Sequence, residues 1–238
     1  MTVIGSARGL TRNYGARVAV DRVDLDLLKG EVLGLIGPNG AGKSTLLLLL
    51  AGLIPPTSGQ VLIDGLPAEE VAMRGAGTVG LVTANPGLYP LLTGRENLRF
   101  FGGLYGRGPK EVDALTEPLL AELELTTELD ELASTYSSGT AQKVSVARAL
   151  MLDPAVLLLD EPTSHLDPPS AWMVHEVVRA RANAGMSVVL ATHDLNAAEH
   201  VCDRVAAMKQ RLVRVTSLFG PRRAPPPGLL AGLYQEAR

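Results

Sequence analysis

Residues 37–45, Gly-Pro-Asn-Gly-Ala-Gly-Lys-Ser-Thr, hold the residue types that bind the phosphate chain of a nucleotide. They match the phosphate-loop pattern G-x-x-x-x-G-K-S/T and lie between the apolar run VLGLI and the helical run LLLLLAGL, the required strand–loop–helix context. Glycines let backbone N–H groups curl around the phosphates, and the next helix presents its positive end. The residues expected to bind the nucleotide are Gly37, Pro38, Asn39, Gly40, Ala41, Gly42, Lys43, Ser44 and Thr45.

Two side chains of this loop carry distinct chemistry. Lys43 would supply a cation to the β and γ phosphates, and the hydroxyl of Ser44 can ligate Mg²⁺. The alternative is a glycine-rich turn that binds nothing, which the flanking strand and helix disfavour. The loop therefore indicates a nucleotide site.

An acidic pair ends the apolar run of VLLLDEPTSHLD, residues 156–167. The run is apolar at every position, as expected for a strand covered on both faces, and ligands of parallel sheets bind at the strands' carboxyl ends. Successive strand residues point to opposite sides, so the two carboxylates can serve different purposes. Asp160 would hold Mg²⁺, and Glu161 would polarise the attacking water as general base. The alternative is a solvated strand end before a proline turn.

A similar apolar run, SVVLATHDL at 187–195, ends in Thr192, His193 and Asp194. A histidine after a strand is often an ordinary polar cap. At this sheet edge, however, His193 could bridge the γ-phosphate and Glu161 and so sense the terminal phosphate.

Helical patterns alternate with short β-rich runs, which predicts a mostly parallel α/β sheet. Residues 91–152 lack a convincing strand and read as a helical lobe inserted into the sheet, with breaks at GRGP (106–109) and TTELDELAST. Asp167 followed by two prolines predicts a helix start, and Gly185 its stop. The predicted strand runs are Val32–Ile36, Val61–Ile63, Val79–Val82, Val156–Leu159, Val188–Ala191 and Val205–Met208.

Composition limits the function classes. The 238-residue chain has a net charge of −3, which argues against a nucleic-acid binder. Its single cysteine, Cys202, excludes an internal disulfide framework and is expected to be a small buried residue. The longest apolar run, Leu46–Ile54, is far below the roughly eighteen residues that span a bilayer, so another chain would do the spanning. The proline-rich stretch GPRRAPPPG is expected to lack regular structure.

A second phosphate-binding feature is suggested by YSSGTAQKV, residues 136–144. Apolar residues from Val144 onward recur at helical spacing, so a helix is expected with Ser137 or Ser138 as its N-cap. Gly139 lies in the first turn, where glycine weakens a helix. A simple serine-capped helix is one interpretation; a close approach to a phosphate is the other.

Taken together, these motifs resemble the ATP-binding subunit of an ABC transporter over most of residues 8–215. Residues 37–45 resemble Walker A, 136–142 the signature motif, 156–161 Walker B, 163–167 the D-loop, and His193 the switch histidine. The resemblance implies a RecA-like, mostly parallel α/β core with an antiparallel β subdomain and a helical lobe at about 88–152. One ATPase domain would cover 1–215, with a tail over 216–238. Tyr14 is where the family places an aromatic ring against adenine; a half-buried strand-end ring is the alternative.

The resemblance also implies partners. In this family two subunits pair head to tail, so Ser137 and Gly139 would bind the γ-phosphate of the ATP held by a second subunit, identical or different. The chain would bind ATP and Mg²⁺, hydrolyse ATP, and drive a separate transmembrane permease from the cytoplasmic face of the membrane, without binding nucleic acid. An apolar groove of Leu88, Tyr89, Leu91 and Leu92 is a candidate docking surface for that permease.

Two departures from the family pattern keep alternatives open. The signature reads Tyr-Ser-Ser-Gly-Thr where Leu-Ser-Gly-Gly-Gln is common, a looser form that, with GLYPLLTGRENL, resembles exporters. The Q-loop glutamine, which normally reaches Mg²⁺, falls on Ala84, and the adjacent Asn85 is shorter and differently directed. The chain could therefore be a weakly catalytic partner in a heterodimer. A soluble ABC ATPase of translation or DNA maintenance fits less well, because the chain has one cassette, no inserted coiled coil and no basic excess.

Overall fold

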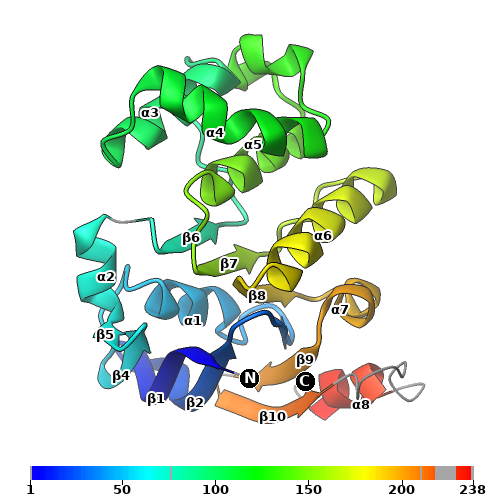
Figure 1. Cartoon of the computed structure of the whole chain (residues 1–238). Coiled ribbons are helices and arrows are strands. Elements are labelled where there is room, and N and C mark those ends of the chain that lie inside the picture. Colours follow the sequence, from blue (N-terminus) through cyan, green and yellow to red (C-terminus); the bar gives the residue numbers. More distant parts are fainter. Residues whose placement is uncertain (1, 76, 210, 218–228, 237–238) are drawn as a thin grey trace.

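The computed structural model describes residues 2–75, 77–209, 211–217 and 229–236 of the chain. It contains a six-stranded sheet, a four-stranded sheet and a helical lobe that stands apart from the four-stranded sheet (Figure 1). The predicted alternation of strands and helices is therefore confirmed.

The six-stranded sheet is parallel except at one edge. Its order is β10-β9-β3-β8-β7-β6, and only the β9–β10 pair is antiparallel. The strands are β3 (Val32–Ile36), β6 (Val79–Val82), β7 (Val156–Asp160), β8 (Ser187–Thr192), β9 (Arg204–Lys209) and β10 (Arg211–Ser217). Because β3, β6, β7 and β8 run in one direction, the segments that follow them emerge at the same edge. That edge gathers the phosphate loop, the acidic pair and His193, whereas the segment at 136–142 lies in the helical lobe.

Strand β7 is covered on both faces, so its residues do not alternate between apolar and polar. Leu157 and Leu159 pack into a core beneath the lobe, whereas Val156 and Leu158 pack into a second core on the opposite face. All five residues of the strand are buried. A parallel strand covered on both faces needs apolar side chains at every position, as predicted.

The four-stranded antiparallel sheet has the order β2-β1-β4-β5. Its strands are β1 (Val3–Tyr14), β2 (Arg17–Leu28), β4 (Ser58–Ile63) and β5 (Leu66–Pro67), joined by helices α1 (Lys43–Leu50) and α2 (Ala68–Arg74) to the rest of the fold. Of the strands in this sheet, only part of β4, Val61–Ile63, was predicted from an apolar run in the sequence. Strands β1 and β2 mix buried with exposed positions, because one face packs on the core and the other meets solvent.

The helical lobe lies between β6 and β7 in the sequence, as expected. It holds α3 (Gly94–Leu104), α4 (Pro109–Glu122), two 3₁₀ turns (Thr127–Asp130 and Ala133–Thr135) and α5 (Ser138–Leu150). Within 91–152, all of which the structure describes, the only β pairing is an isolated bridge between Thr93 and Leu132. The GRGP segment separates α3 from α4, and TTELDELAST forms the two 3₁₀ turns.

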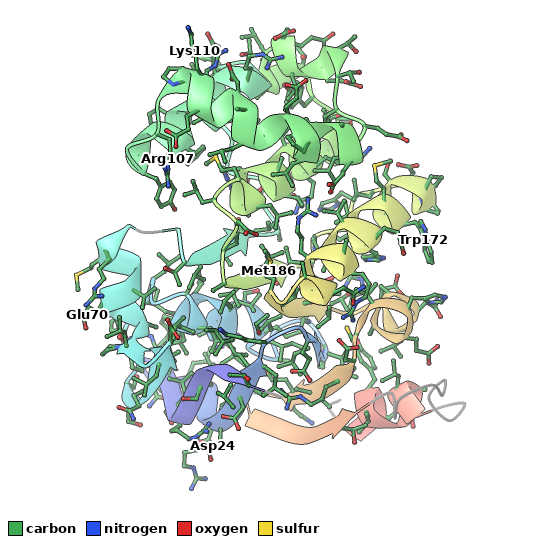
Figure 2. The ribbon with its side chains drawn as sticks, viewed as in Figure 1. Asp24, Glu70, Arg107, Lys110, Trp172 and Met186 are labelled. Atoms are coloured by element: carbon green, nitrogen blue, oxygen red, sulfur yellow. The ribbon has the colours of Figure 1, made fainter. Side chains whose placement is uncertain are left out.

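The C-terminal third completes the cover of the sheet. Helix α6 (Pro168–Asn183) has Asp167 as its N-cap, and Gly185 follows its end with φ 112°, both as predicted. Trp172 projects outward from α6, while Met186, just beyond the helix, is buried (Figure 2). Helix α7 (Leu195–Val201) follows β8.

Two described segments of the expected tail, residues 216–238, form regular structure. Strand β10 continues to Ser217, and helix α8 (Leu229–Glu236) buries Leu230 and Leu233 against α7 and β9. These leucines lie three residues apart and so share one helix face. Two apolar positions next to a proline-rich stretch are too few to predict a helix from the sequence. The stretch GPRRAPPPG lies outside the described residues. Across the described ranges, no helix is both long enough and apolar enough to cross a bilayer.

Candidate functional site

The phosphate loop connects β3 to α1 at the carboxyl edge of the parallel sheet. Gly42 is the N-cap of α1 with φ 101°, and a Cβ there would lie 2.2 Å from the Ala19 carbonyl oxygen. Only glycine fits this position, because both its backbone angle and the space beside it exclude a side chain. Helix α1 therefore starts with its N–H groups directed at the loop, and the loop forms a cradle for anions.

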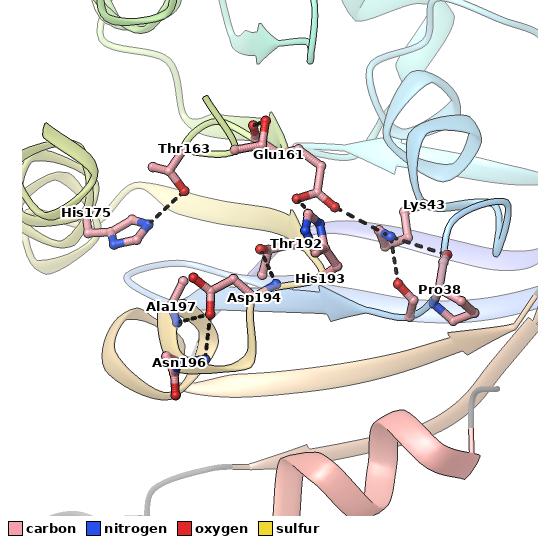
Figure 3. A network of polar contacts seen from close by, with 12 residues as sticks. Pro38, Lys43, Glu161, Thr163, His175, Thr192, His193, Asp194, Asn196 and Ala197 are labelled. Carbon is pink, nitrogen blue, oxygen red and sulfur yellow. Dashed lines mark hydrogen bonds and ion pairs between the residues drawn. The ribbon is translucent and has the colours of Figure 1, made fainter. Parts of the chain in front are cut away.

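Lys43 folds back into this cradle. Its Nζ donates hydrogen bonds to the carbonyl oxygens of Gly37 (2.8 Å) and Pro38 (3.4 Å), and the residue is only 6% exposed. The same Nζ lies 3.6 Å from Oε1 of Glu161 (Figure 3). A buried ammonium beside backbone carbonyls and one carboxylate provides a fixed positive charge inside the loop.

Glu161 lies between two partners. Its Oε2 is 2.9 Å from Nδ1 of His193, and its Oε1 faces Lys43 and is buried without a hydrogen-bond donor (Figure 3). The backbone has φ 50°, a strained value for this residue type, and its N–H donates to the Ala191 carbonyl at 2.9 Å. This left-handed turn directs the side chain away from the course of β7. A carboxylate oxygen with a free lone pair is what a general base requires.

Asp160 is the last residue of β7 and is buried. Burial raises the pKa of its carboxyl above the usual range; the Ser44 hydroxyl and the Lys43 ammonium oppose that rise, and the Glu161 charge adds to it. The two carboxylates therefore sit in different surroundings, as expected, but the left-handed turn at Glu161, just beyond β7, separates them rather than the alternation of strand residues. Asp160 lies with Ser44, and Glu161 lies with His193.

The donor set also fits a magnesium ion bound mainly through a nucleotide. Among the described residues, no group of three or more histidine, cysteine, aspartate or glutamate side chains could hold a metal by itself. Ser44 and Asp160 offer one hydroxyl and one carboxylate, and Mg²⁺ commonly takes one or two protein oxygens together with phosphate oxygens and waters.

These residues line a pocket of about 310 Å³. The lining includes Tyr14, the loop residues from Pro38 to Thr45, Asp160 and Glu161, all of which the sequence had singled out. His193 joins the site through Glu161, and Gly37 through its bond to Lys43. Lining residues that the sequence had not marked as contacts are Arg17, Ala19 and Ala84.

Tyr14 stands at the end of β1 and is 47% exposed. The guanidinium of Arg12 lies over its ring, 4.7 Å from the centroid, and Arg17 lines the same pocket. Arg12 thus covers the ring that the resemblance assigned to adenine, and Arg17 adds a second positive charge to the pocket. Both arginines lie within three residues of Tyr14 in the sequence, but neither belongs to a recognised nucleotide-binding motif.

The segment after β6 brings Ala84 to the pocket but turns Asn85 away from it. Asn85 Oδ1 accepts the Gly87 N–H at 3.0 Å, and its carbonyl accepts the Thr83 hydroxyl at 2.6 Å. Asn85 is therefore engaged in its own turn and does not replace a glutamine at position 84.

Ser137 is the N-cap of α5, and its Oγ accepts the Thr140 N–H at 3.0 Å. Ser137 and Ser138 are exposed, and a Cβ on Gly139 would approach Leu166 of the D-loop region to 3.1 Å. None of residues 137–139, all described, is among those that line the pocket of the same chain. The two phosphate-binding features are thus separate within one chain.

Comparisons with known proteins identify the family of the chain. The family model described as ABC transporter matches residues 20–164. The chain is 36% identical over 208 residues to the Nod factor export ATP-binding protein I of Cupriavidus metallidurans, covering 87% of this chain and 69% of that protein. It is 34% identical over 204 residues to the linearmycin resistance ATP-binding protein of Bacillus subtilis, covering 86% and 66%. The chain thus spans about two thirds of the length of these relatives.

Solved structures give the same result for the fold. An ATP-binding subunit of an ABC transporter superposes with a TM-score of 0.86 at 30% identity, covering 99% of both chains. A dimeric ATP-binding cassette in a post-hydrolysis state, bound to ADP and phosphate, superposes with a TM-score of 0.82 at 28% identity, covering 91% of this chain and 99% of that one. The predicted ABC-ATPase fold is confirmed. The chain belongs to the ABC transporter family of ATP-binding proteins.

Proposed function

We propose that this chain binds ATP with Mg²⁺ and hydrolyses its terminal phosphate. The N–H groups of the loop and Lys43 would bind the β and γ phosphates, and Tyr14 would stack on the adenine. Ser44 and Asp160 would hold the Mg²⁺, which when bound neutralises charge on the phosphate oxygens.

The observation that carries this proposal is the position of Glu161 between Lys43 and His193. Glu161 would accept the proton of the attacking water as the water oxygen bonds to the terminal phosphorus, while the bond from that phosphorus to the bridging oxygen of ADP breaks. His193 would hold the carboxylate in this orientation through its Nδ1. The side chain of Glu161 is 16% exposed and lines the pocket in which the nucleotide would lie.

The second half of the site would come from another subunit. The exposed end of α5, with Ser137 and Gly139, offers the positive end of a 13-residue helix to an anion. We infer that two chains meet head to tail, each end of α5 binding the γ-phosphate held by the other chain's loop. One named neighbour, the post-hydrolysis cassette, is itself a dimer. ATP would thus close the dimer, and hydrolysis would reopen it.

The dimer would serve an exporter. Relatives are named for Nod factor export and for linearmycin resistance, and a separate transmembrane permease would bind this subunit at the cytoplasmic face. Closure would then move the permease as a rigid body. Leu88, Tyr89, Leu91 and Leu92 were the expected docking groove; of these, Leu91 is 81% exposed and Tyr89 packs against Phe100 and Phe101.

A second candidate is supported by Ala84. With alanine lining the pocket and Asn85 engaged elsewhere, the loop offers no side-chain oxygen to the metal. The chain could then be a slowly hydrolysing partner in a heterodimer.

Steady-state ATP hydrolysis by the purified chain tests the proposal. If two chains form each site, the rate per mole of protein should rise with protein concentration, and gel filtration should show an ATP-dependent dimer. A monomer whose rate per mole stays constant would contradict the composite site. A dimer that binds ATP but scarcely turns it over would favour the second candidate.

A further inference from the structure

Arg17 has a position in the nucleotide pocket that no motif of the sequence assigned. It begins β2 and faces Tyr14 of β1 across the turn formed by residues 15–16. Two residues further along β2, the Ala19 carbonyl packs closely on the phosphate loop, because a Cβ on Gly42 would lie 2.2 Å from its oxygen. The backbone of Arg17 is therefore held between its pairing with Tyr14 and this contact with the loop.

The guanidinium of Arg17 lies beside the middle of the phosphate loop. A Cβ on Gly40 would be 4.0 Å from Nη2 of Arg17, and both residues line the nucleotide pocket with Lys43. Arg17 is an exposed residue, so its N–H groups remain open to a ligand that enters the pocket. The charged end of a long side chain thus lies next to a loop whose N–H groups suit an anion.

Arg17 has no carboxylate partner among the described residues, although its own strand carries three carboxylates. Other groups engage each of them: Asp21 pairs with Arg22, Asp24 accepts the Gly9 N–H at 2.7 Å, and Asp26 pairs with Arg8. The cation at the pocket end of β2 is therefore left for a ligand.

The charges of the pocket also favour an anion at Arg17. The charged residues of the lining are Lys43, Arg17, Asp160 and Glu161, so their formal charges cancel. Lys43 already bonds to two backbone carbonyls and lies 3.6 Å from Glu161. A triphosphate with bound magnesium still carries net negative charge, and Arg17 is the cation of this lining that is left to neutralise it.

The ligand that suits Arg17 is a phosphate group. A guanidinium presents parallel N–H groups that match two oxygens of one phosphate, and such charge-assisted bonds are roughly twice as strong as neutral ones. The base would have its own platform at Tyr14, whereas Gly40 belongs to the loop that would bind the phosphates. The alternative is a solvated surface arginine that contacts no ligand.

We propose that Arg17 binds the phosphate chain of the nucleotide as a second side-chain cation beside Lys43. This inference rests on the proposed function, because it requires a nucleotide in this pocket, and it adds a binding residue outside the recognised motifs. Because the contact is to phosphate oxygens, it should not depend on the base.

The test measures the binding of two probes, ATP and base-free tripolyphosphate, each with Mg²⁺, by isothermal titration calorimetry. Arg17→Gln should weaken the binding of both probes by about tenfold, and Arg17→Lys should restore part of the loss because it keeps the charge. Tyr14→Ala should weaken ATP alone, because tripolyphosphate has no base to stack. The matched control is Arg22→Gln, on the same strand but paired with Asp21 and 78% exposed, which should bind both probes as the wild type does.

The outcomes separate this inference from the proposed function. ATP binding by Arg17→Gln as tight as that of the wild type would overturn the inference. A loss confined to ATP, with tripolyphosphate binding unchanged, would place Arg17 at the base and would also overturn it. A wild type that binds ATP with the expected dependence on Arg17 but does not hydrolyse it would contradict the proposed function and leave the inference standing. A wild type that binds neither probe would contradict both.

Discussion

The nucleotide pocket and the exposed end of α5 both suit a phosphate, yet they are built differently. The pocket is assembled at the ends of β3, β7 and β8; Lys43 and Asp160 are buried there, and Glu161 contacts both Lys43 and His193. The end of α5 is exposed, and the Ser137 hydroxyl bonds only locally, to the N–H and the hydroxyl of Thr140. The difference indicates a divided site, with one half preorganised within the chain and the other half directed outward.

Separation within one chain has a physical consequence. If the pocket binds most of the phosphate chain as proposed, its groups are already in place, and a single chain should bind ATP. The outward helix end can add its N–H groups only when a second chain arrives. Substitutions in the two regions should therefore separate binding, dimer formation and hydrolysis.

The largest expected effect comes from Glu161→Gln. Loss of the general base should lower ATP turnover by at least about a hundredfold, while ATP binding and the ATP-dependent dimer remain. Turnover and gel filtration would be compared with Glu176→Gln, an exposed change on α6 that should be near wild type. Near-normal hydrolysis by Glu161→Gln would remove Glu161 from its role.

The second largest effect is expected from Ser137→Arg, which changes the exposed end of α5 and leaves the nucleotide pocket intact. The larger cationic side chain should block the approach of the second chain, so ATP-dependent dimer formation should be lost while ATP still binds to the monomer. Ser134→Arg, an exposed change before α5, serves as the control for added charge. A dimer that forms normally on gel filtration with Ser137→Arg would show that α5 does not meet a second chain there.

A smaller effect is expected from Ala84→Gln inside the pocket. An amide oxygen near the metal should tighten the apparent affinity for Mg²⁺ by on the order of a few-fold, measured as the midpoint of a magnesium titration of hydrolysis. Asn85→Ala should leave that midpoint unchanged, because Asn85 bonds to Gly87. Identical titrations for wild type and Ala84→Gln would show that position 84 does not approach the metal.

The smallest effect concerns stability. Because burial raises the pKa of Asp160, its charge opposes folding at neutral pH, and Asp160→Asn should raise the free energy of unfolding there while reducing hydrolysis. The gain should shrink as pH falls through the raised folded-state pKa towards the usual aspartate value of about 3.9, since both states are then protonated. Denaturant unfolding at several pH values measures this. Destabilisation by Asp160→Asn at neutral pH would contradict the sign.

Local motifs predicted most of the pocket because each follows its own strand. Gly42, Asp160 and His193 each follow an apolar run that predicts a strand. The carboxyl ends of parallel strands lie at one edge of the sheet, so these three residues could be predicted to lie close together. The contact between Lys43 and Glu161, and the arrival of Arg17, depend on pairings across the fold that no local pattern encodes.

The composite pocket is tested most directly by joining its two halves covalently. Chains carrying Ser137→Cys and chains carrying Asn39→Cys, each with Glu161→Gln to retain ATP, would be given tags of different size and mixed with a short thiol crosslinker. Cys202 is buried, and burial raises its pKa, so it should not compete. We expect a crosslinked product that contains one chain of each kind and forms only with ATP. Absence of that product from an ATP-bound dimer, or efficient crosslinking within a single chain carrying both cysteines, would contradict the divided site.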